Sequence, residues 1–334
     1  MKHWILLLGL TCSVWGMAQT CESRGPNVIL FTWDGVRSHE FFHGTGLFHH
    51  FQLPRSERGT ILKKFWSNHA QEGVVLGKYG GYKIGSKIAI SLPSYQALMV
   101  GHATPCMNNS CEDIKEETVL ESVRSGLNLP KKDVAVFASW NKILSASASN
   151  PSQITHGIYP DIFDDGSDDP TMREIQKKGM EDLPKWEGSR KDQYTFELGM
   201  HYLKKHCPRL LYISLVDSDE YGHEKDYPNY VQSLKTYDHY LDQVIETLKQ
   251  MGDYGQQTTL IVSTDHSRGQ GPFWVGHAVT KNSEKRVFLY ARGRGVKPTG
   301  ISAKKGGHVN IKPTIEYLMG LKPSGNILPH INVD

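Results

Sequence analysis

The sequence predicts an α/β domain with a central, mostly parallel sheet and helices on both of its faces. Two observations carry this prediction. Five short runs rich in apolar and β-branched residues recur along the chain, and segments with the apolar spacing of helices lie between them. An alternation of strands and helices is typical of a parallel sheet whose two faces are covered. In such sheets, ligands bind outside the carboxyl ends of the strands.

The expected strands are continuous apolar runs of the kind found in buried parallel strands. They cover residues 27–33, 134–140, 210–216, 259–264 and 286–291. Helical spacing covers residues 117–123, 194–202 and 230–248. The segment from about residue 147 to 190 is polar and rich in Gly, Pro and Asp, so we expect it to be a surface excursion that caps the ligand site.

The first residues have the composition of a secretory signal peptide. A basic start precedes an apolar run over residues 4–10, and Gly16 and Ala18 are spaced like a signal-peptidase site. The run is far shorter than the roughly 20 apolar residues that an uninterrupted membrane span requires. We therefore expect removal of residues 1–18, no stable membrane anchor, and a single domain over residues 19–334 in the periplasm or outside the cell.

The charge and the cysteine content indicate which partners and which cellular compartment to expect. Lys and Arg total 38 against 35 Asp and Glu, and this net charge of +3 gives no reason to expect a nucleic-acid partner. Four cysteines remain after the signal, an even count that is typical of disulfides in an oxidising compartment. We pair Cys106 with Cys111, which close a short loop of turn-forming residues, and Cys21 with Cys207. A zinc site made of these thiols would need a second close pair of cysteines.

Acidic residues stand at the carboxyl ends of three expected strands. The first, third and fourth strands are followed by Asp34, Asp219 and Asp265, respectively. Because these ends share one edge of a parallel sheet, the three carboxylates should converge there. Converging carboxylates repel one another unless a cation binds them.

Histidines accompany these carboxylates. His223 comes four residues after Asp219, His266 is adjacent to Asp265, and His277 follows in FWVGHAV. Aspartate oxygens and imidazole nitrogens are the ligands that suit zinc and related divalent metals. Three Asp and three His are enough for two ions with an open position each. We therefore expect two divalent metal ions, with zinc as the first choice.

Ser91 is the candidate nucleophile. It opens the segment SLPSYQALMVG, in which Pro93 restricts Leu92 to an extended conformation and the following residues can be helical. We expect Ser91 at a strand-to-helix turn, where a helix N-terminus presents N–H groups to an anion. A metal close by would help to remove the proton from its hydroxyl group.

These motifs resemble the alkaline phosphatase superfamily, and most nearly its branch of type I phosphodiesterases and nucleotide pyrophosphatases. The resemblance covers most of the chain after the signal and rests on NVILFTWDG, SLPSYQALMVG, VDSDEYGH, STDHSRG and WVGH in the family's order. It implies an alkaline-phosphatase-like fold and an exported hydrolase of small phosphate esters in which Ser91 carries the phosphoryl group transiently. The implied ligands of one zinc are Asp34, Ser91, Asp265 and His266, and those of the other are Asp219, His223 and His277.

Several readings stay open. The phosphodiesterase branch usually has threonine as its nucleophile, whereas this chain has serine, as alkaline phosphatases do, so monoesters and diesters are both possible substrates. A sulfatase-type hydrolase is an alternative, because Ser91, Leu92 and Pro93 resemble the Ser/Cys-x-Pro-x-Arg site of sulfatases, although residue 95 is Tyr. Phosphomutases share the fold, but no mutase insertion is recognisable. A non-catalytic binding protein that retains the fold is a further alternative, and the complete set of nucleophile and ligands argues against it.

Basic and aromatic residues near the motifs are candidates for contacting the rest of the substrate. No arginine is obviously placed to hold a phosphomonoester, and the oligomeric state is not indicated. The basic candidates near the motifs are Arg37, Lys83, Lys87, Lys142 and Arg268. Tyr221 and Trp274 stand beside predicted ligands and are candidates for lining the pocket of the leaving group.

Overall fold

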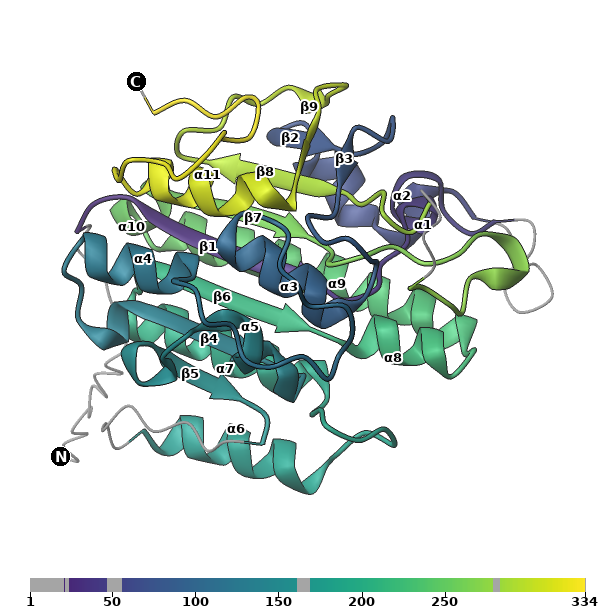
Figure 1. Cartoon of the computed structure of the whole chain (residues 1–334), viewed down its shortest axis with the longest axis horizontal. Coiled ribbons are helices and arrows are strands. Elements are labelled where there is room, and N and C mark those ends of the chain that lie inside the picture. Colours follow the sequence, from purple (N-terminus) through teal and green to yellow (C-terminus); the bar gives the residue numbers. More distant parts are fainter. Residues whose placement is uncertain (1–20, 22–23, 47–55, 161–168, 279–282, 334) are drawn as a thin grey trace, which may run out of the picture.

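The computed structural model describes residues 21, 24–46, 56–160, 169–278 and 283–333, so the expected signal peptide lies outside the described residues. An eight-stranded sheet forms its centre, in the order β5-β4-β6-β1-β7-β8-β2-β9 (Figure 1). The strands are β1 (Asn27–Trp33), β2 (Gly73–Leu76), β4 (Val134–Ala138), β5 (Thr155–Ile158), β6 (Leu210–Leu215), β7 (Thr258–Ser263), β8 (Leu289–Gly293) and β9 (Gly300–Ile301). A separate two-stranded sheet joins β3 (Tyr82–Lys83) to β10 (Gly306–Gly307).

The sheet is mostly parallel, which confirms the prediction. β1 lies at its centre and pairs in parallel with β6 and β7, so that Phe31 is level with Ile213 on one side and Val262 on the other. β8 runs antiparallel to both of its neighbours, β7 and β2. The carboxyl ends of β1, β6 and β7 therefore meet at one edge.

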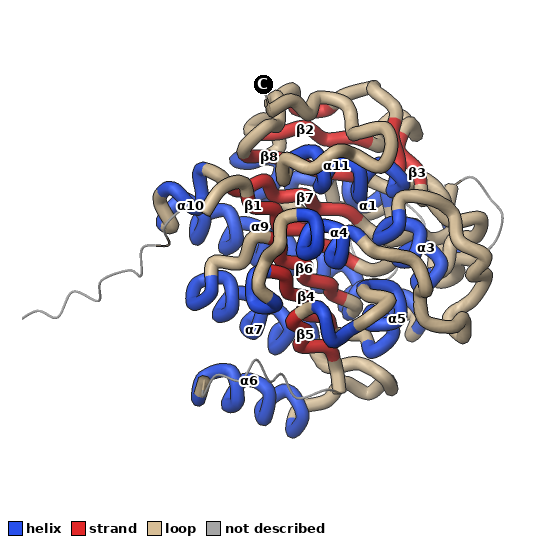
Figure 2. The backbone as a smooth tube through the Cα atoms, turned by 60° about the vertical axis from the view of Figure 1, so that its left-hand side comes forward, coloured by secondary structure: helices blue, strands red, loops and turns tan. Residues whose placement is uncertain are grey.

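Helices cover both faces of this sheet (Figure 2). Because side chains alternate along a strand, Phe31 and Trp33 of β1 join one apolar core while Val28 and Leu30 join the other. The first core includes side chains of α7 (Asp192–His206) and α9 (Tyr227–Gln250). The second includes side chains of α3 (Ser91–Val100), α4 (Val119–Gly126) and α11 (Ile311–Leu318).

Two of these helices, α9 and α4, carry clear start signals. α9 begins after Asp226, whose carboxylate accepts a hydrogen bond from the Asn229 N–H at 3.2 Å, and α4 begins with a capping box between Thr118 and Glu121. The other α-helices are α1 (Ser38–His43), α2 (Arg58–Ile61), α5 (Leu144–Ser147), α6 (Pro170–Glu181), α8 (Asp217–His223) and α10 (Asp253–Gln256).

The structure differs from the sequence-based expectation at three places. β8 begins at Leu289 rather than at Arg286, and it is antiparallel. The segment expected as a polar excursion contributes edge strand β5 to the sheet and also forms α6. β5 has the sequence THGI, which is no continuous apolar run, so its strand conformation depends on pairing with β4. Ser91 follows a bent, non-strand segment rather than a strand.

Both expected disulfides are confirmed. Cys21 is bonded to Cys207, with 6.1 Å between their Cα atoms, and Cys106 is bonded to Cys111, with 5.6 Å between theirs. Within the described part of the chain, no helix combines the length and the apolar character needed to cross a bilayer.

Gly35 makes a tight turn after β1 that a side chain would obstruct. Its φ of +65° lies in the left-handed region, and a Cβ atom there would collide with the Asp219 carboxylate. We expect Gly35→Ala to lower the free energy of unfolding by at least about 1 kcal/mol, from backbone strain alone. Gly59→Ala in α2 is the matched control, because a Cβ at Gly59 meets nothing within 4 Å. Equal unfolding midpoints in denaturant for the two variants would contradict this account.

The disulfide between Cys21 and Cys207 closes a loop with a sequence separation of 186, against 5 for the second disulfide. Since loop-closure entropy grows with loop length, we expect its removal to cost about 5 kcal/mol, compared with about 2 kcal/mol for the short loop. Denaturant unfolding of the two double Cys→Ala variants tests this. A larger loss from the short loop would contradict the expectation.

Candidate active site

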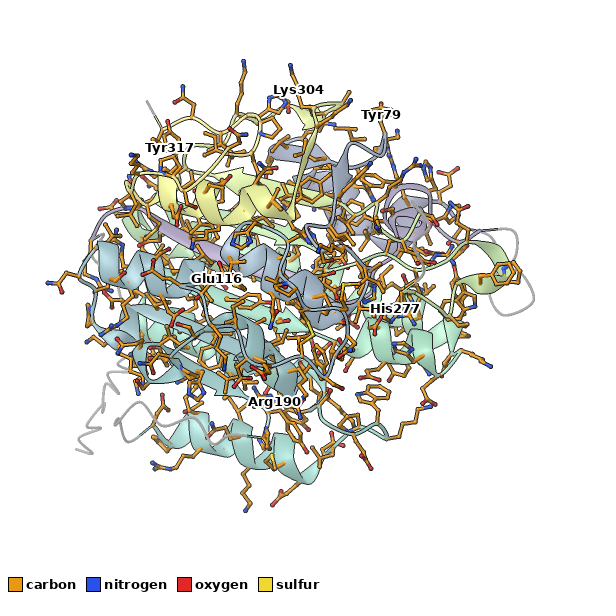
Figure 3. The ribbon with its side chains drawn as sticks, in the orientation of Figure 1. Tyr79, Glu116, Arg190, His277, Lys304 and Tyr317 are labelled. Atoms are coloured by element: carbon orange, nitrogen blue, oxygen red, sulfur yellow. A yellow bond between two sulfur atoms is a disulfide. The ribbon has the colours of Figure 1, made fainter. Side chains whose placement is uncertain are left out.

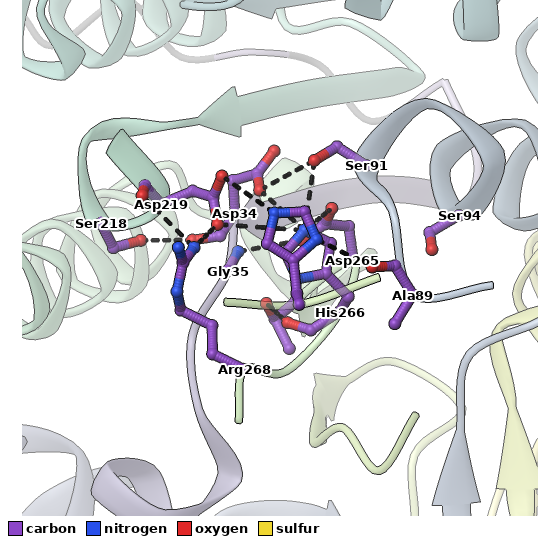
Figure 4. A network of polar contacts seen from close by, with 12 residues as sticks. Asp34, Gly35, Ala89, Ser91, Ser94, Ser218, Asp219, Asp265, His266 and Arg268 are labelled. Atoms are coloured by element: carbon purple, nitrogen blue, oxygen red, sulfur yellow. Dashed lines mark hydrogen bonds and ion pairs between the residues drawn. The ribbon is translucent and has the colours of Figure 1, made fainter. Parts of the chain in front are cut away.

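The predicted acidic residues meet at the carboxyl edge of the sheet (Figure 4). Asp34 follows β1 and its N–H donates to the Leu215 carbonyl at the end of β6. Asp265 follows β7, and its Oδ1 accepts a hydrogen bond from the Gly35 N–H at 3.0 Å. Asp219 lies in α8, directly after β6. The parallel sheet therefore brings all three carboxylates to one place, as expected.

One group of candidate metal ligands consists of Asp34, Asp265 and His266. One ligand atom of each lies within 4.8 Å of the others, and all three residues are buried. His266 Nε2 is 3.7 Å from Asp34 Oδ1 and 3.3 Å from Asp265 Oδ2. We call this group the first donor triad.

The second donor triad consists of Asp219, His223 and His277, which meet the same 4.8 Å criterion. Asp219 and His223 stand four residues apart on α8 and thus on one face of the helix, with 2.9 Å between Oδ2 and Nε2. His277 comes from a loop after β7 and lies beside α8 (Figure 3); its Nε2 is 3.1 Å from His223 Nε2. The helical conformation of residues 217–223 was not predicted from the sequence.

The imidazole tautomers fit cation binding. His266 Nδ1 is 3.1 Å from the Ser267 carbonyl, and His277 Nδ1 is 2.8 Å from the Ala89 carbonyl. Since a carbonyl only accepts hydrogen bonds, each Nδ1 carries the proton and each Nε2 offers a lone pair. The Nε2 lone pair of His266 faces Asp265 Oδ2, which is buried and accepts no hydrogen bond from the described residues. Two acceptors facing each other favour a cation between them.

The pKa shifts agree with this donor chemistry. Burial, with Asp265 as a second cause, raises the pKa of Asp34 well above its ordinary value, and burial raises the pKa of Asp265 to about 7. Burial lowers the pKa of His266 to about 3 and also lowers the pKa of His277. The imidazoles are therefore neutral at pH 7, which is the form that binds metals. A bound cation would offset the cost of burying these charges and, for Asp34, the repulsion from Asp265.

Ser91 is the first residue of α3 and faces the first donor triad. Its Oγ lies 3.2 Å from His266 Nε2 and 3.4 Å from Asp34 Oδ1, and the residue is only 4% exposed. The neighbouring Leu92 N–H donates to Asn109 Oδ1 at 3.0 Å. Asn109 belongs to the loop closed by Cys106 and Cys111, and sequence reasoning missed it, although the short disulfide loop was a signal that this segment is fixed in place.

Two further side chains hold the carboxylates. Tyr95 donates its hydroxyl to Asp34 Oδ2 at 3.0 Å, one turn of α3 beyond Ser91. The buried Arg268 guanidinium pairs with the Asp219 carboxylate and donates to the carbonyls of Trp274 and Val275. Arg268 therefore supports Asp219 and is not free to hold a substrate phosphate.

The other candidates for substrate contact are arranged differently from the expectation. Arg37 is buried and pairs with Glu40 at 2.9 Å. Trp274 is buried against Tyr227, with 5.0 Å between ring centroids. Tyr221 stands two residues from both Asp219 and His223 and so points to the opposite side of α8, where its ring lies 5.0 Å from that of Trp186.

Comparison with protein families matches residues 186–323 to the Metalloenzyme superfamily. Among curated proteins, a phosphopentomutase of Methylobacterium sp. (strain 4-46) is 33% identical over 118 residues, which is 35% of this chain and 26% of that protein. A phosphopentomutase of Carboxydothermus hydrogenoformans is 35% identical over 132 residues, which is 37% of this chain and 29% of that protein. The chain thus matches only about a quarter of the length of these relatives.

Solved structures match nearly the whole chain. The alkaline phosphatase PafA has a TM-score of 0.62 at 10% identity, with 93% of this chain and 100% of that chain covered. The phosphonate monoester hydrolase of Silicibacter pomeroyi gives 0.61 at 12% identity, with 91% and 76% covered. A 2-O GAG sulfatase gives 0.59 at 14% identity, with 90% and 72% covered. The chain thus has the fold of the alkaline phosphatase-like superfamily, and its residues 186–323 match the Metalloenzyme superfamily.

Proposed function

We propose that this chain is a metal-dependent hydrolase of small phosphate esters that acts through a transient phosphoserine at Ser91. One observation carries the proposal: the Ser91 hydroxyl lies at the start of α3, 3.2 Å from His266 Nε2, and the two donor triads lie at the same edge of the sheet. A hydroxyl beside two sets of metal-binding side chains is the arrangement that phosphoryl transfer through serine requires.

The donor set fits two divalent cations, and zinc suits its mixture of carboxylate and imidazole. The first donor triad with Ser91 would hold one ion, and the second donor triad would hold the other. Bound there, such ions would neutralise the charge of the phosphoryl oxygens and lower the pKa of the serine hydroxyl.

The chain's own residues orient the reaction. Asp34 and His266 fix the direction of the Ser91 hydroxyl, and Tyr95 fixes the Asp34 carboxylate. In the first step, Ser91 Oγ forms a bond to phosphorus as the bond from phosphorus to the alcohol oxygen breaks, and the proton that Ser91 gives up ends on the departing alcohol. In the second step, water attacks the phosphoserine, which releases phosphate and restores the hydroxyl.

Tyr95 favours a phosphate ester over a sulfate ester. The sulfatase pattern that Ser91 and Pro93 resemble requires an arginine at position 95. Here the Tyr95 side chain is fully buried and bonded to Asp34, so it holds a carboxylate in place. A sulfatase-type activity therefore lacks the residue pattern on which it depends.

A phosphomutase is the second candidate, because the curated relatives are phosphopentomutases. A mutase would return the phosphoryl group from Ser91 to a sugar hydroxyl instead of to water. Both reactions share the serine step and differ only in the acceptor.

We also propose that the mature protein is a single exported domain over residues 19–334. The two disulfides support export, because disulfides persist in oxidising compartments. The type I phosphodiesterase branch remains the proposed position within the superfamily.

The test compares purified protein with Ser91→Ala, in zinc, on p-nitrophenyl phosphate, bis-p-nitrophenyl phosphate and p-nitrophenyl sulfate. We expect turnover of one phosphate ester and a loss of at least about 10³-fold in the variant, as for other nucleophile deletions. Ser94→Ala is the matched control. Ser94 lies one turn further along α3, and its hydroxyl bonds Ser86 at 2.9 Å, outside the donor triads (Figure 4).

A pentose phosphate in the same assay separates the two candidates. Release of free phosphate supports the hydrolase, whereas migration of the phosphoryl group without release supports the mutase. Preference for the sulfate ester, or equal phosphate turnover by wild type and Ser91→Ala, would contradict the proposal.

A further inference from the structure

The first turn of α8 is held by a carboxylate from another helix. Asp192 at the start of α7 accepts hydrogen bonds from the N–H groups of Val216 and Asp217, both at 2.8 Å. These are N–H groups at the beginning of α8, which have no partner within the helix itself. Asp219 and His223, two members of the second donor triad, follow on this same helix.

Asp192 is buried among further donors. Ser139, just beyond β4, donates its hydroxyl to Asp192 Oδ1 at 2.6 Å, and Tyr237 of α9 donates its hydroxyl to Asp192 Oδ2 at 2.5 Å. Asp192 is 2% exposed, and the Arg190 guanidinium is a charged neighbour that interacts with it electrostatically. Four hydrogen bonds from three elements of the fold thus satisfy both carboxylate oxygens of Asp192.

Tyr237 extends the same network to the first donor triad. Its oxygen accepts a hydrogen bond from the Ser218 N–H at 3.0 Å while its proton goes to Asp192. The Ser218 hydroxyl in turn donates to the Asp34 carbonyl. Asp192 and Tyr237 together therefore bind three successive N–H groups of α8, and Ser218 links that helix to the turn after β1.

A helix this short has little stability of its own. α8 covers only Asp217–His223 and ends at His223, whose side chain is exposed. The direction of the helix is set where it begins, and a small tilt there moves both Asp219 and His223. Asp192 touches neither of these side chains, so any influence on them passes through the backbone.

We propose that Asp192, with Tyr237, is a positioning residue for the second donor triad: it fixes the first turn of α8 so that Asp219 and His223 face His277. The inference rests on the proposed function for the identity of the ligand, a divalent cation. It goes beyond that function because Asp192 and Tyr237 would set the geometry of the second donor triad without being ligands themselves.

The experiment measures zinc binding by competition with a chromophoric chelator, together with the melting temperature. For wild type we expect two ions. Asp192→Ala should lower the zinc affinity of the second donor triad by about 10- to 100-fold, the usual effect of losing a partner that orients ligands. The affinity of the first donor triad should change by less than about threefold. Tyr237→Phe keeps the ring and removes one hydroxyl group, so it should lower the zinc affinity of the second donor triad to a smaller extent.

Asp238→Ala is the matched control. Asp238 is a buried carboxylate that also accepts two backbone hydrogen bonds, from the N–H groups of Lys64 at 2.8 Å and Phe65 at 2.7 Å. It holds a segment outside both donor triads, so its loss should lower the melting temperature and leave both zinc affinities unchanged. In a His223→Ala background, Asp192→Ala should not weaken the remaining ion further.

The outcomes separate the two claims. If wild type binds two ions and both Asp192→Ala and Tyr237→Phe retain both affinities, the positioning role is wrong while the proposed function stands. Equal weakening of both ions, or equal effects of Asp192→Ala and Asp238→Ala, would show a merely structural role. If Asp192→Ala does not fold, Tyr237→Phe decides. Wild type that binds no zinc would overturn both the proposed function and this inference.

Discussion

The burial of carboxylates side by side at one edge of a parallel sheet is the constraint on which the rest of this structure depends. Asp34 and Asp265 are buried there, and burial raises the pKa of each above its ordinary value. Hydrogen bonds from Tyr95 and the Gly35 N–H offset only part of this cost, and the neighbouring His266 imidazole is neutral and offers a lone pair rather than a charge. Divalent cations would remove it, and this is why an electrostatically unfavourable cluster can be the centre of a stable fold.

Around these carboxylates, the ends of strands and the starts of helices fix the position of each candidate ligand. Strand ends place Asp34 and Asp265, one helix start places Ser91, and a second short helix places Asp219 and His223. Backbone carbonyl groups fix the tautomers of His266 and His277. Gly35 allows the turn after β1 to approach Asp219 without a steric conflict. The site is therefore preorganised by the backbone, and most of its side chains are held before any ligand arrives.

The central strands and the position of the candidate site were predictable from the sequence. The continuous apolar runs indicated the central strands, and the acidic residues after three of these five runs indicated where the site would form. The sequence could not reveal features that depend on tertiary pairing. β5 has no apolar run and is a strand because β4 accepts it, and residues 217–223 form a helix whose two faces separate Asp219 from Tyr221. The sequence showed that Arg268 is a basic residue near a motif, but only the structure shows that it pairs with Asp219.

Crystallography of the zinc-loaded protein, with anomalous scattering measured at the zinc edge, tests the central claim most directly. We predict two anomalous peaks. One should lie among Asp34, Asp265 and His266, and the other among Asp219, His223 and His277, the two groups whose ligand atoms lie within 4.8 Å of one another. A single peak, or peaks away from these side chains, would contradict the claim that the sheet edge is a two-metal site.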